Sequence, residues 1–440
     1  MRLSNKYNRL LAFIFLCSAA VSLKLDVQEK SKTFKKVLTV NESSIVDIEH
    51  RRGDLNIYHT NEKEAYVEVE LKVRGSIEED LQKIIDKFSI EVSEKQNEIY
   101  VRTKTKIESW SETNNMFSSK FRIKFSDGDV IKNKIESLEL ICNLYIPKIK
   151  TLRASNRYDN ILWDNIDCDV DADIYSGKIE GSSIQGNVKI RSKYSKIFLG
   201  DMANGDLNIY NSTVNMGNAE NLVIVDKYSK FKLKNAKSLD LKLHDSDLEA
   251  EKIDGKLHVV AKYSDLDIES CGSSTIDFHD SDIKLAKCGS MEVESKYSTY
   301  ILGELTDLLM TSHDDNLIAD KICGLEITDS KYSEYKVMRF TGALDVKSSH
   351  DDDYVFTKVQ DFEGLHFVSK YSTLNFPLES SQACAINAEL KYGSIKIDRS
   401  NFVVSREIEK DSKIELEAKT KGTNHKMVKV VGHDSKFVFD

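Results

Sequence analysis

Two short motifs recur at a fixed spacing over most of this chain. Lys-Tyr-Ser stands at Tyr194 and recurs every 34 or 35 residues as far as Tyr332. His-Asp lies midway between successive tyrosine motifs, first at His244. A fixed period of this kind is the signature of a repeat protein. Together the two series predict sixteen corners, most of them 17 to 20 residues apart: Tyr158, Tyr175, Tyr194, Tyr210, Tyr228, His244-Asp245, Tyr263, His279-Asp280, Tyr297, His313-Asp314, Tyr332, His350-Asp351, Tyr371, Tyr392, Asp411 and His433-Asp434.

Each repeat unit reads as strand, corner, strand and turn. Before the motif at Tyr263 every second residue from Leu257 is apolar, and the alternation resumes out of phase at Leu266. Alternation is typical of half-buried strands, and a phase slip marks a corner between them. No helical stretch separates the strands, which excludes a doubly wound fold. Since one unit cannot bury its own apolar face, the units must stack. The predicted fold is all-β, a parallel β-solenoid of about 16 short coils of ~17 residues.

The spacing alone allows a coil of 17 or of 35 residues. In the longer coil identical motifs would stack, which places aspartate on aspartate about 4.8 Å away. Like charges directly opposite are unfavourable in a sheet, so charge favours the 17-residue coil with alternating motifs. The shorter coil puts Cys271 beside Cys288, within reach of a disulfide, whereas the longer one puts Cys288 beside Cys323. We therefore expect the Cys271–Cys288 pair.

The first residues have the features of a secretory signal peptide. Basic residues precede an apolar run at 10–23 that is short for a membrane span, and small residues follow at 20–22. We expect residues 1–22 to be removed on export. Cys17 raises the alternative of a lipid anchor, but the bulky residues before it fit a lipobox poorly. No later run could span a bilayer, so the expected location is the periplasm, the cell surface or the extracellular space.

The repeat is faint in residues 23–150, which we expect to form a β-rich N-terminal cap. The apolar residues from Leu81 have helical spacing and Ser76 stands at the cap position, which predicts one helix at 77–88. A solenoid needs its open end covered, and this segment suits that task. Residues 151–440 form the predicted repeat domain.

Three stretches carry a resemblance to a known family. They are VDIEHRRGDLNI at Val46 to Ile57, Leu144-Tyr145-Ile146-Pro147 leading into Ala154-Ser155-Asn156-Arg157-Tyr158-Asp159, and Lys391-Tyr392-Gly393-Ser394-Ile395. In these the chain resembles the bacterial "putative adhesin" proteins, exported β-solenoids of unknown function. Most corners here have Ser where the family has Gly, and half have His-Asp in place of Tyr. The resemblance implies export and adhesion, and it supplies no binding residues.

Composition narrows the classes of partner. Charged residues make up 31% of the chain and the net charge is −9, so the surface is well solvated and has no nucleic-acid footprint. Two prolines suit a chain made of ladder-forming strands. Seven cysteines, six of them after the signal segment, are too few for a disulfide scaffold. We expect a monomer that binds an unknown surface ligand, either a glycan or a protein.

The His-Asp corners hold metal-ligand residue types. Calcium prefers clustered carboxylates, and the richest cluster is His350, Asp351, Asp352 and Asp353. Recurrence in every second coil argues for ordinary turns, where Asp and Ser satisfy local backbone groups. We therefore expect no cofactor, and keep calcium at these four residues as the alternative.

The tyrosine corners offer a second candidate site. A row of exposed rings could bind a carbohydrate or a protein, since tyrosine has a flat apolar face and a polar tip. The alternative is that the rings only pack along the corner. The strip consists of Tyr194, Tyr228, Tyr263, Tyr297, Tyr332 and Tyr371.

No nucleophile–base pair, Gly-rich phosphate loop or zinc-type cysteine spacing occurs, so no enzyme is predicted. The expected function is an exported, adhesin-like binding or scaffold protein. The alternative is a polysaccharide-processing enzyme on a parallel β-helix, which rests on fold analogy alone.

Overall fold

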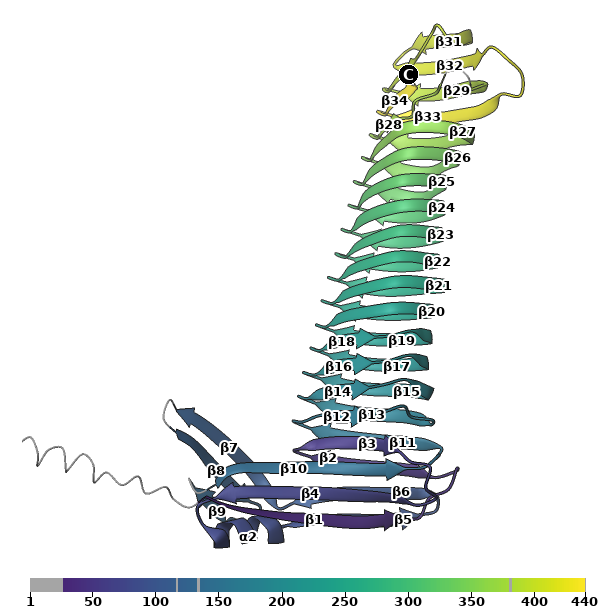
Figure 1. Ribbon diagram of the computed structural model, residues 1–440. Helices are drawn as coiled ribbons and strands as arrows, with labels where there is room; N and C mark the ends of the chain where they lie inside the picture. Colours follow the sequence, from purple (N-terminus) through teal and green to yellow (C-terminus); the bar gives the residue numbers. More distant parts are fainter. Residues whose placement is uncertain (1–26, 116–117, 133–134, 380–381, 440) are drawn as a thin grey trace, which may run out of the picture.

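The computed structural model describes residues 27–115, 118–132, 135–379 and 382–439, so the signal peptide and Cys17 lie outside the described residues. The chain forms a long rod of stacked coils on a wider base (Figure 1). All but three of the strands belong to one 31-stranded sheet. The predicted all-β solenoid is confirmed.

The coils of the rod pair in parallel, one above the next. Val259 lies opposite Ile276, and Ile276 opposite Val293, a step of 17 residues. The 17-residue coil is therefore confirmed. The strands of these coils are β2 (Ile45–Arg51), β3 (Asp54–His59), β11 (Thr151–Arg157), β12 (Ile161–Trp163), β13 (Asp169–Tyr175), β14 (Lys178–Gly181), β15 (Ile184–Lys193), β16 (Lys196–Leu199), β17 (Met202–Tyr210), β18 (Thr213–Met216), β19 (Ala219–Lys227), β20 (Lys230–His244), β21 (Asp247–Lys262), β22 (Asp265–His279), β23 (Asp282–Lys296), β24 (Thr299–His313), β25 (Asn316–Lys331), β26 (Glu334–His350), β27 (Asp353–Lys370) and β28 (Thr373–Asn375).

The base is built from the segment between the first two coils and from the N-terminal strand. β2 and β3 form the first coil, and β11 and β12 stack directly on it. The chain between these coils pairs antiparallel in the base, β10 with β4 and β4 with β1. The elements of the base are β1 (Gln28–Leu38), β4 (Ala65–Gly75), α2 (Glu78–Asp86), β5 (Phe88–Lys95), β6 (Glu98–Thr105) and β10 (Ile135–Ile146), with a separate sheet of β7 (Ile107–Asn115), β8 (Ser118–Phe125) and β9 (Val130–Lys132).

The helix α2 confirms the helical prediction within two residues at each end. Leu81, Ile84 and Ile85 are buried, as their spacing requires. The predicted cap is wrong, because Ile77 occupies the N-cap with extended backbone and no side chain caps the helix. Acidic residues in the first turn stabilise the helix instead, because they interact with the positive end of its dipole.

The far end of the rod does not follow the order of the sequence. β27 pairs in parallel with β33, and β33 pairs in turn with β29, so the last coil of the chain lies between two earlier ones. β29 then pairs antiparallel with β32, and β32 with β31. The elements are β29 (Cys384–Lys391), β30 (Ser394–Ile397), β31 (Phe402–Lys410), β32 (Lys413–Thr420), β33 (Lys426–His433) and β34 (Lys436–Phe439).

Asp411 is therefore not a solenoid corner, and this prediction was wrong. Asp411 and Ser412 form the two-residue turn between β31 and β32, both with positive φ. A two-residue hairpin turn of type I′ has positive φ at both residues. Aspartate also adopts the left-handed conformation at corners of the rod. The presence of aspartate therefore does not distinguish a hairpin turn from a solenoid corner.

The charge argument for the shorter coil was too general. Asp247, Asp265 and Asp282 are register partners in three adjacent coils, so the 17-residue coil also stacks like charges. Burial and the two neighbouring carboxylates raise the pKa of Asp265. Lys230 offsets part of this repulsion, since its Nζ lies 2.7 Å from Asp247 Oδ2.

Candidate functional site

One residue at each corner adopts the left-handed conformation. In most tyrosine corners it is the tyrosine, as in Tyr263 with φ of 54°. At the Tyr175 and Tyr210 corners it is the next residue, Ser176 or Asn211. In a His-Asp corner it is the aspartate, as in Asp280 with φ of 50°, and the histidine comes one residue earlier. Positive φ is uncommon for residues other than glycine, although aspartate tolerates it better than most. In the Lys-Tyr and His-Asp corners the left-handed residue is therefore the one that follows Lys or His.

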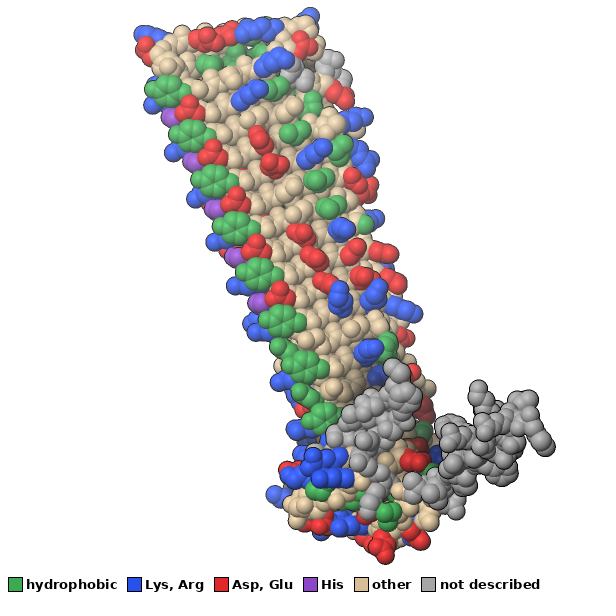
Figure 2. Space-filling model, turned by 90° about the vertical axis from the view of Figure 1, so that its left-hand side faces the viewer, with side chains coloured by type: hydrophobic (Ala, Val, Ile, Leu, Met, Phe, Trp, Pro, Cys, Tyr) green, Lys and Arg blue, Asp and Glu red, His purple; other side chains and the backbone are tan. Residues whose placement is uncertain are grey.

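The aromatic rings at the corners form one continuous ladder along an edge of the rod (Figure 2). Neighbouring rings meet edge to face: the Tyr263 and His279 centroids lie 6.1 Å apart at 73°, and those of His279 and Tyr297 lie 5.7 Å apart at 69°. This is a favourable arrangement for aromatic pairs. In stacking order the rings are Tyr158, Tyr175, Tyr194, Tyr210, Tyr228, His244, Tyr263, His279, Tyr297, His313, Tyr332, His350, Tyr371, His433 and Tyr392.

The six tyrosines of the predicted strip all belong to this ladder. About half of each side chain is exposed, from 47% at Tyr228 to 51% at Tyr263. From Tyr228 onward a histidine ring stands between successive tyrosines, so the strip alternates phenol and imidazole. The structure brings the predicted residues together in one line, and each ring keeps an exposed side.

The serine that follows most corners builds a second ladder inside the rod. Ser264 N donates to Ser281 Oγ at 3.2 Å, and Ser281 Oγ donates to His279 O at 3.1 Å. The same pattern links the other coils, for example Ser195 N to Ser212 Oγ at 3.0 Å. Each buried serine thus satisfies two backbone groups at a sharp turn, which buried polar groups require. The Tyr-Ser and Asp-Ser pairs of the sequence are explained by this geometry.

The structure does not bring the four calcium candidates together. Asp352 replaces the corner serine and is buried, where its Oδ1 accepts from Ser333 N at 2.8 Å and its Oδ2 from Ser349 Oγ at 2.6 Å. Burial raises the pKa of Asp352. Asp351 lies outside, with Oδ2 3.0 Å from His350 Nδ1, and Asp353 begins the next strand. Within the described ranges no group of three or more His, Cys, Asp or Glu could hold a metal ion.

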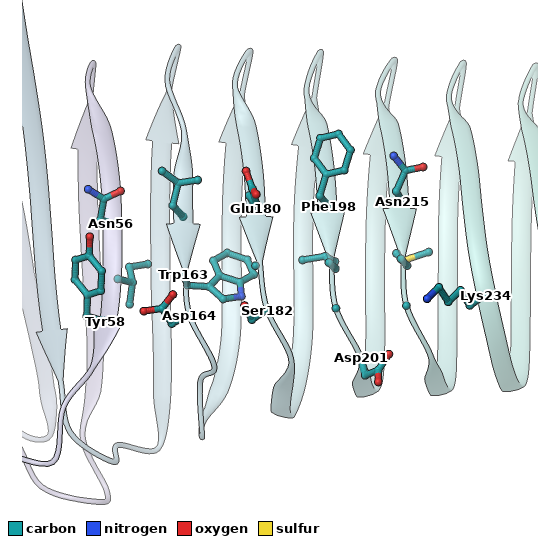
Figure 3. A pocket seen from close by; sticks show the side chains of 17 residues that line it. Asn56, Tyr58, Trp163, Asp164, Glu180, Ser182, Phe198, Asp201, Asn215 and Lys234 are labelled. Carbon is teal, nitrogen blue, oxygen red and sulfur yellow. The ribbon is translucent and has the colours of Figure 1, made fainter.

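A groove of about 690 Å³, which the sequence analysis missed, opens at the base of the rod (Figure 3). It lies over β12, β14, β16 and β18, which are only three or four residues long. Gly181, Gly200 and Gly217 line it, and a Cβ on any of them would come within 3.0 Å of an atom of the neighbouring coil. Three glycines at nearly the coil spacing were the sequence signal that could have revealed it.

Trp163 forms part of the floor of this groove. Its indole lies over Gly181, since a Cβ on that glycine would come within 2.0 Å of Trp163 Nε1. Only 4% of Trp163 is exposed, and among the described residues its Nε1 has no hydrogen-bond partner. A buried N–H of this kind calls for an explanation, because such groups are nearly always paired.

No family model matches the chain, and no curated protein matches it. Among the solved structures similar to it is a "putative cell adhesion protein" from Clostridium sporogenes, with 11% sequence identity and a TM-score of 0.17, where the match covers 93% of this chain and 99% of that chain. A "putative adhesin" from Bacteroides fragilis has 11% identity and a TM-score of 0.23, with 62% of this chain and 96% of that chain covered. A "putative lipid binding protein" from Parabacteroides distasonis has 10% identity and a TM-score of 0.20, with 74% of this chain and 97% of that chain covered. Two of these names agree with the family that the sequence resembles. TM-scores this low say nothing about ligands.

Proposed function

We propose that this protein is an exported, rod-shaped binding or scaffold protein of the cell surface or periplasm, and that its ligand is a glycan or a protein. The observation that carries the proposal is the ladder of half-exposed tyrosine and histidine rings along one edge of the rod. Aromatic side chains combine a large apolar area with a polar tip, and they are enriched where proteins bind partners. No helix within the described residues is long and apolar enough to cross a membrane.

Repetition favours binding over catalysis. Chemistry needs one unique set of groups, whereas His279-Asp280 and His313-Asp314 repeat the same arrangement, with Nδ1 to Oδ2 distances of 2.9 and 3.0 Å. A repeated array instead offers many weak contacts to an extended partner, and linked contacts raise avidity without any new interaction. A polysaccharide-processing enzyme would need a constellation that stands apart from the repeat.

The test is a glycan and cell-surface binding screen on the mature chain, with Tyr263→Asn, Tyr297→Asn and Tyr332→Asn combined. Asparagine tolerates the left-handed conformation, so the corners remain while the rings are lost. The matched control changes the intervening left-handed residues, Asp280→Asn with Asp314→Asn. We expect surface binding to weaken at least tenfold in the triple variant and to stay within twofold in the control. Equal binding by both variants would show that the ladder only packs the corner.

A further inference from the structure

The basal groove has the shape of a site for a linear ligand. Its floor is one row of register partners, Trp163, Gly181, Leu199 and Met216, in four adjacent coils. Coils rise about 4.8 Å each, so the row alone spans roughly 14 Å. Beyond Met216 the groove ends at Lys234, where later coils carry side chains in place of glycine.

Two rows of side chains flank this floor. The first is a row of outward-facing register partners that mixes amide, apolar, acidic and aromatic groups: Asn56, Leu162, Glu180, Phe198 and Asn215. The second is mostly polar: Tyr58, Asp164, Ser182, Asp201 and Lys234. Figure 3 shows the labelled members of the two rows on opposite sides of the groove.

The polar groups of the groove are poised for a ligand rich in hydroxyls. Trp163 Nε1 is a buried donor without a partner in the described chain. The side chains of Asp164, Ser182 and Asn215 likewise form no hydrogen bond or ion pair with any described residue. A hydroxyl both donates and accepts, so one ligand type can satisfy the indole, the carboxylate and the amide together. Leaving these groups unpaired around a bound ligand would lose affinity.

Phe198 supplies an apolar face to the same groove. It is 38% exposed on β16, whose other outward residue is Lys196. Sugar rings present apolar C–H faces that pack on aromatic rings, while their hydroxyls point sideways. An exposed aromatic ring beside unpaired polar groups is the usual composition of a small-molecule site, with few precisely placed polar groups.

Charge disfavours an anionic ligand. Glu180 is paired with Lys178 at 2.6 Å, so it adds little net charge. The remaining charged groups of the lining are Asp164 and Asp201 against Lys234, which leaves the groove slightly negative. A uronate or sulfated chain would be repelled, whereas an uncharged sugar would not.

We propose that the basal groove binds a neutral oligosaccharide, with Phe198 packing on a sugar ring and Trp163 Nε1, Asp164 and Asn215 holding its hydroxyls. The inference rests on the proposed binding function, and it assigns that function's ligand class and a site separate from the ring ladder.

The experiment titrates the mature chain with cellohexaose, chitohexaose and mannohexaose by calorimetry, and with a galacturonate hexamer and an unstructured peptide for comparison. Tryptophan emission in a Trp110→Phe background reports Trp163 alone, since the chain has two tryptophans. Phe198→Ala and Asn215→Ala test the groove. Ile318→Ala is the matched control, because Ile318 is similarly exposed and lies in the same outward row seven coils further on.

The expected result is that at least one neutral hexasaccharide binds and shifts the Trp163 emission. Phe198→Ala then raises its Kd at least tenfold and Asn215→Ala at least threefold, while Ile318→Ala stays within twofold. The inference is overturned if no neutral hexasaccharide binds, if Phe198→Ala leaves binding unchanged, or if the galacturonate or the peptide binds the groove instead. A wild-type chain that binds cell surfaces but no neutral hexasaccharide would refute the groove and leave the proposed function standing. A wild-type chain that binds no surface or glycan would refute both.

Discussion

Cys271 and Cys288 are register partners in adjacent coils, and their Sγ atoms lie 2.8 Å apart. This is the neighbour relationship that a 17-residue coil predicts. Cys323 does not continue this row: the row above Cys288 runs through Leu305 and Ile322, so Cys323 is offset by one residue.

We expect mild oxidation to link Cys271 to Cys288. Both thiols are buried, and the S–H of Cys271 donates to Cys288, which lowers the pKa of Cys288 to about 7 and so favours the reactive thiolate. A disulfide closing a loop of this length stabilises by roughly 3 kcal/mol when it is unstrained. Peptide mapping after treatment with a short thiol cross-linker measures the link. Cys288→Ser should abolish it, and a Cys288–Cys323 link would contradict the coil register.

The rod should dominate scattering in solution. Corners that stack from Arg52 to Tyr392 at about 4.8 Å per coil give a length of roughly 75 Å before the base is added. A compact domain of this chain length would have a radius of gyration of about 22 Å. Small-angle scattering should give a clearly larger value and a rod-like distance distribution. A radius near the compact value would contradict the stacked coils.

The sequence was sufficient to predict the rod because the residue pattern, the strands, the corners and the stacking of coils all indicate the same fold. Alternating residues such as Leu257 and Val259 imply strands, and the phase slip at Tyr263 implies a corner. The periodic motif then implies stacking, which the register of β21 and β22 confirms. Such agreement between local and global preferences marks a sequence that specifies one fold.

The remaining features depend on long-range order that the motif does not carry. The placement of β33 between β27 and β29 joins segments far apart in the chain. The corner motif at His433 does not indicate which strands will pair with its own. The basal groove is lined by glycines such as Gly181 and Gly200, which a search for chemical groups passes over. Asp352 was a candidate metal ligand because the sequence gives its residue type and not the orientation of its side chain. In the structure its carboxylate points into the rod.

Calcium should leave the melting temperature unchanged. Asp352 is held inward by Ser333 and Ser349, and Asp351 faces His350, so no set of carboxylates converges on an ion. Thermal unfolding in millimolar calcium and in chelator should coincide. The double variant Asp351→Ala, Asp353→Ala serves as control and should respond to neither. A rise in calcium that this variant loses would contradict the expectation, since an ion that binds only the native state must stabilise it.

Acid should destabilise the first coil, and its contact with the base, through His50. This side chain is fully buried with Nδ1 2.6 Å from Thr103 Oγ1, and burial lowers its pKa to about 3. The unfolded histidine titrates near 6.5, so between these values the unfolded state binds the proton and the native state does not. Stability is therefore complete above about pH 6.5 and falls by about 1.4 kcal/mol per unit below it, until the pKa of the native state is reached.

The variant His50→Asn should remove this dependence. Asparagine already occupies the same inward row in the next coil, at Asn156, the register partner of His50. The measurement is the free energy of unfolding in urea at pH 5 and at pH 7.5. The wild type should lose about 2 kcal/mol between them and His50→Asn almost none of that amount. His258→Asn is the matched control, because His258 is exposed beside Asp240. An acid loss that persists in His50→Asn would place the sensitive group elsewhere.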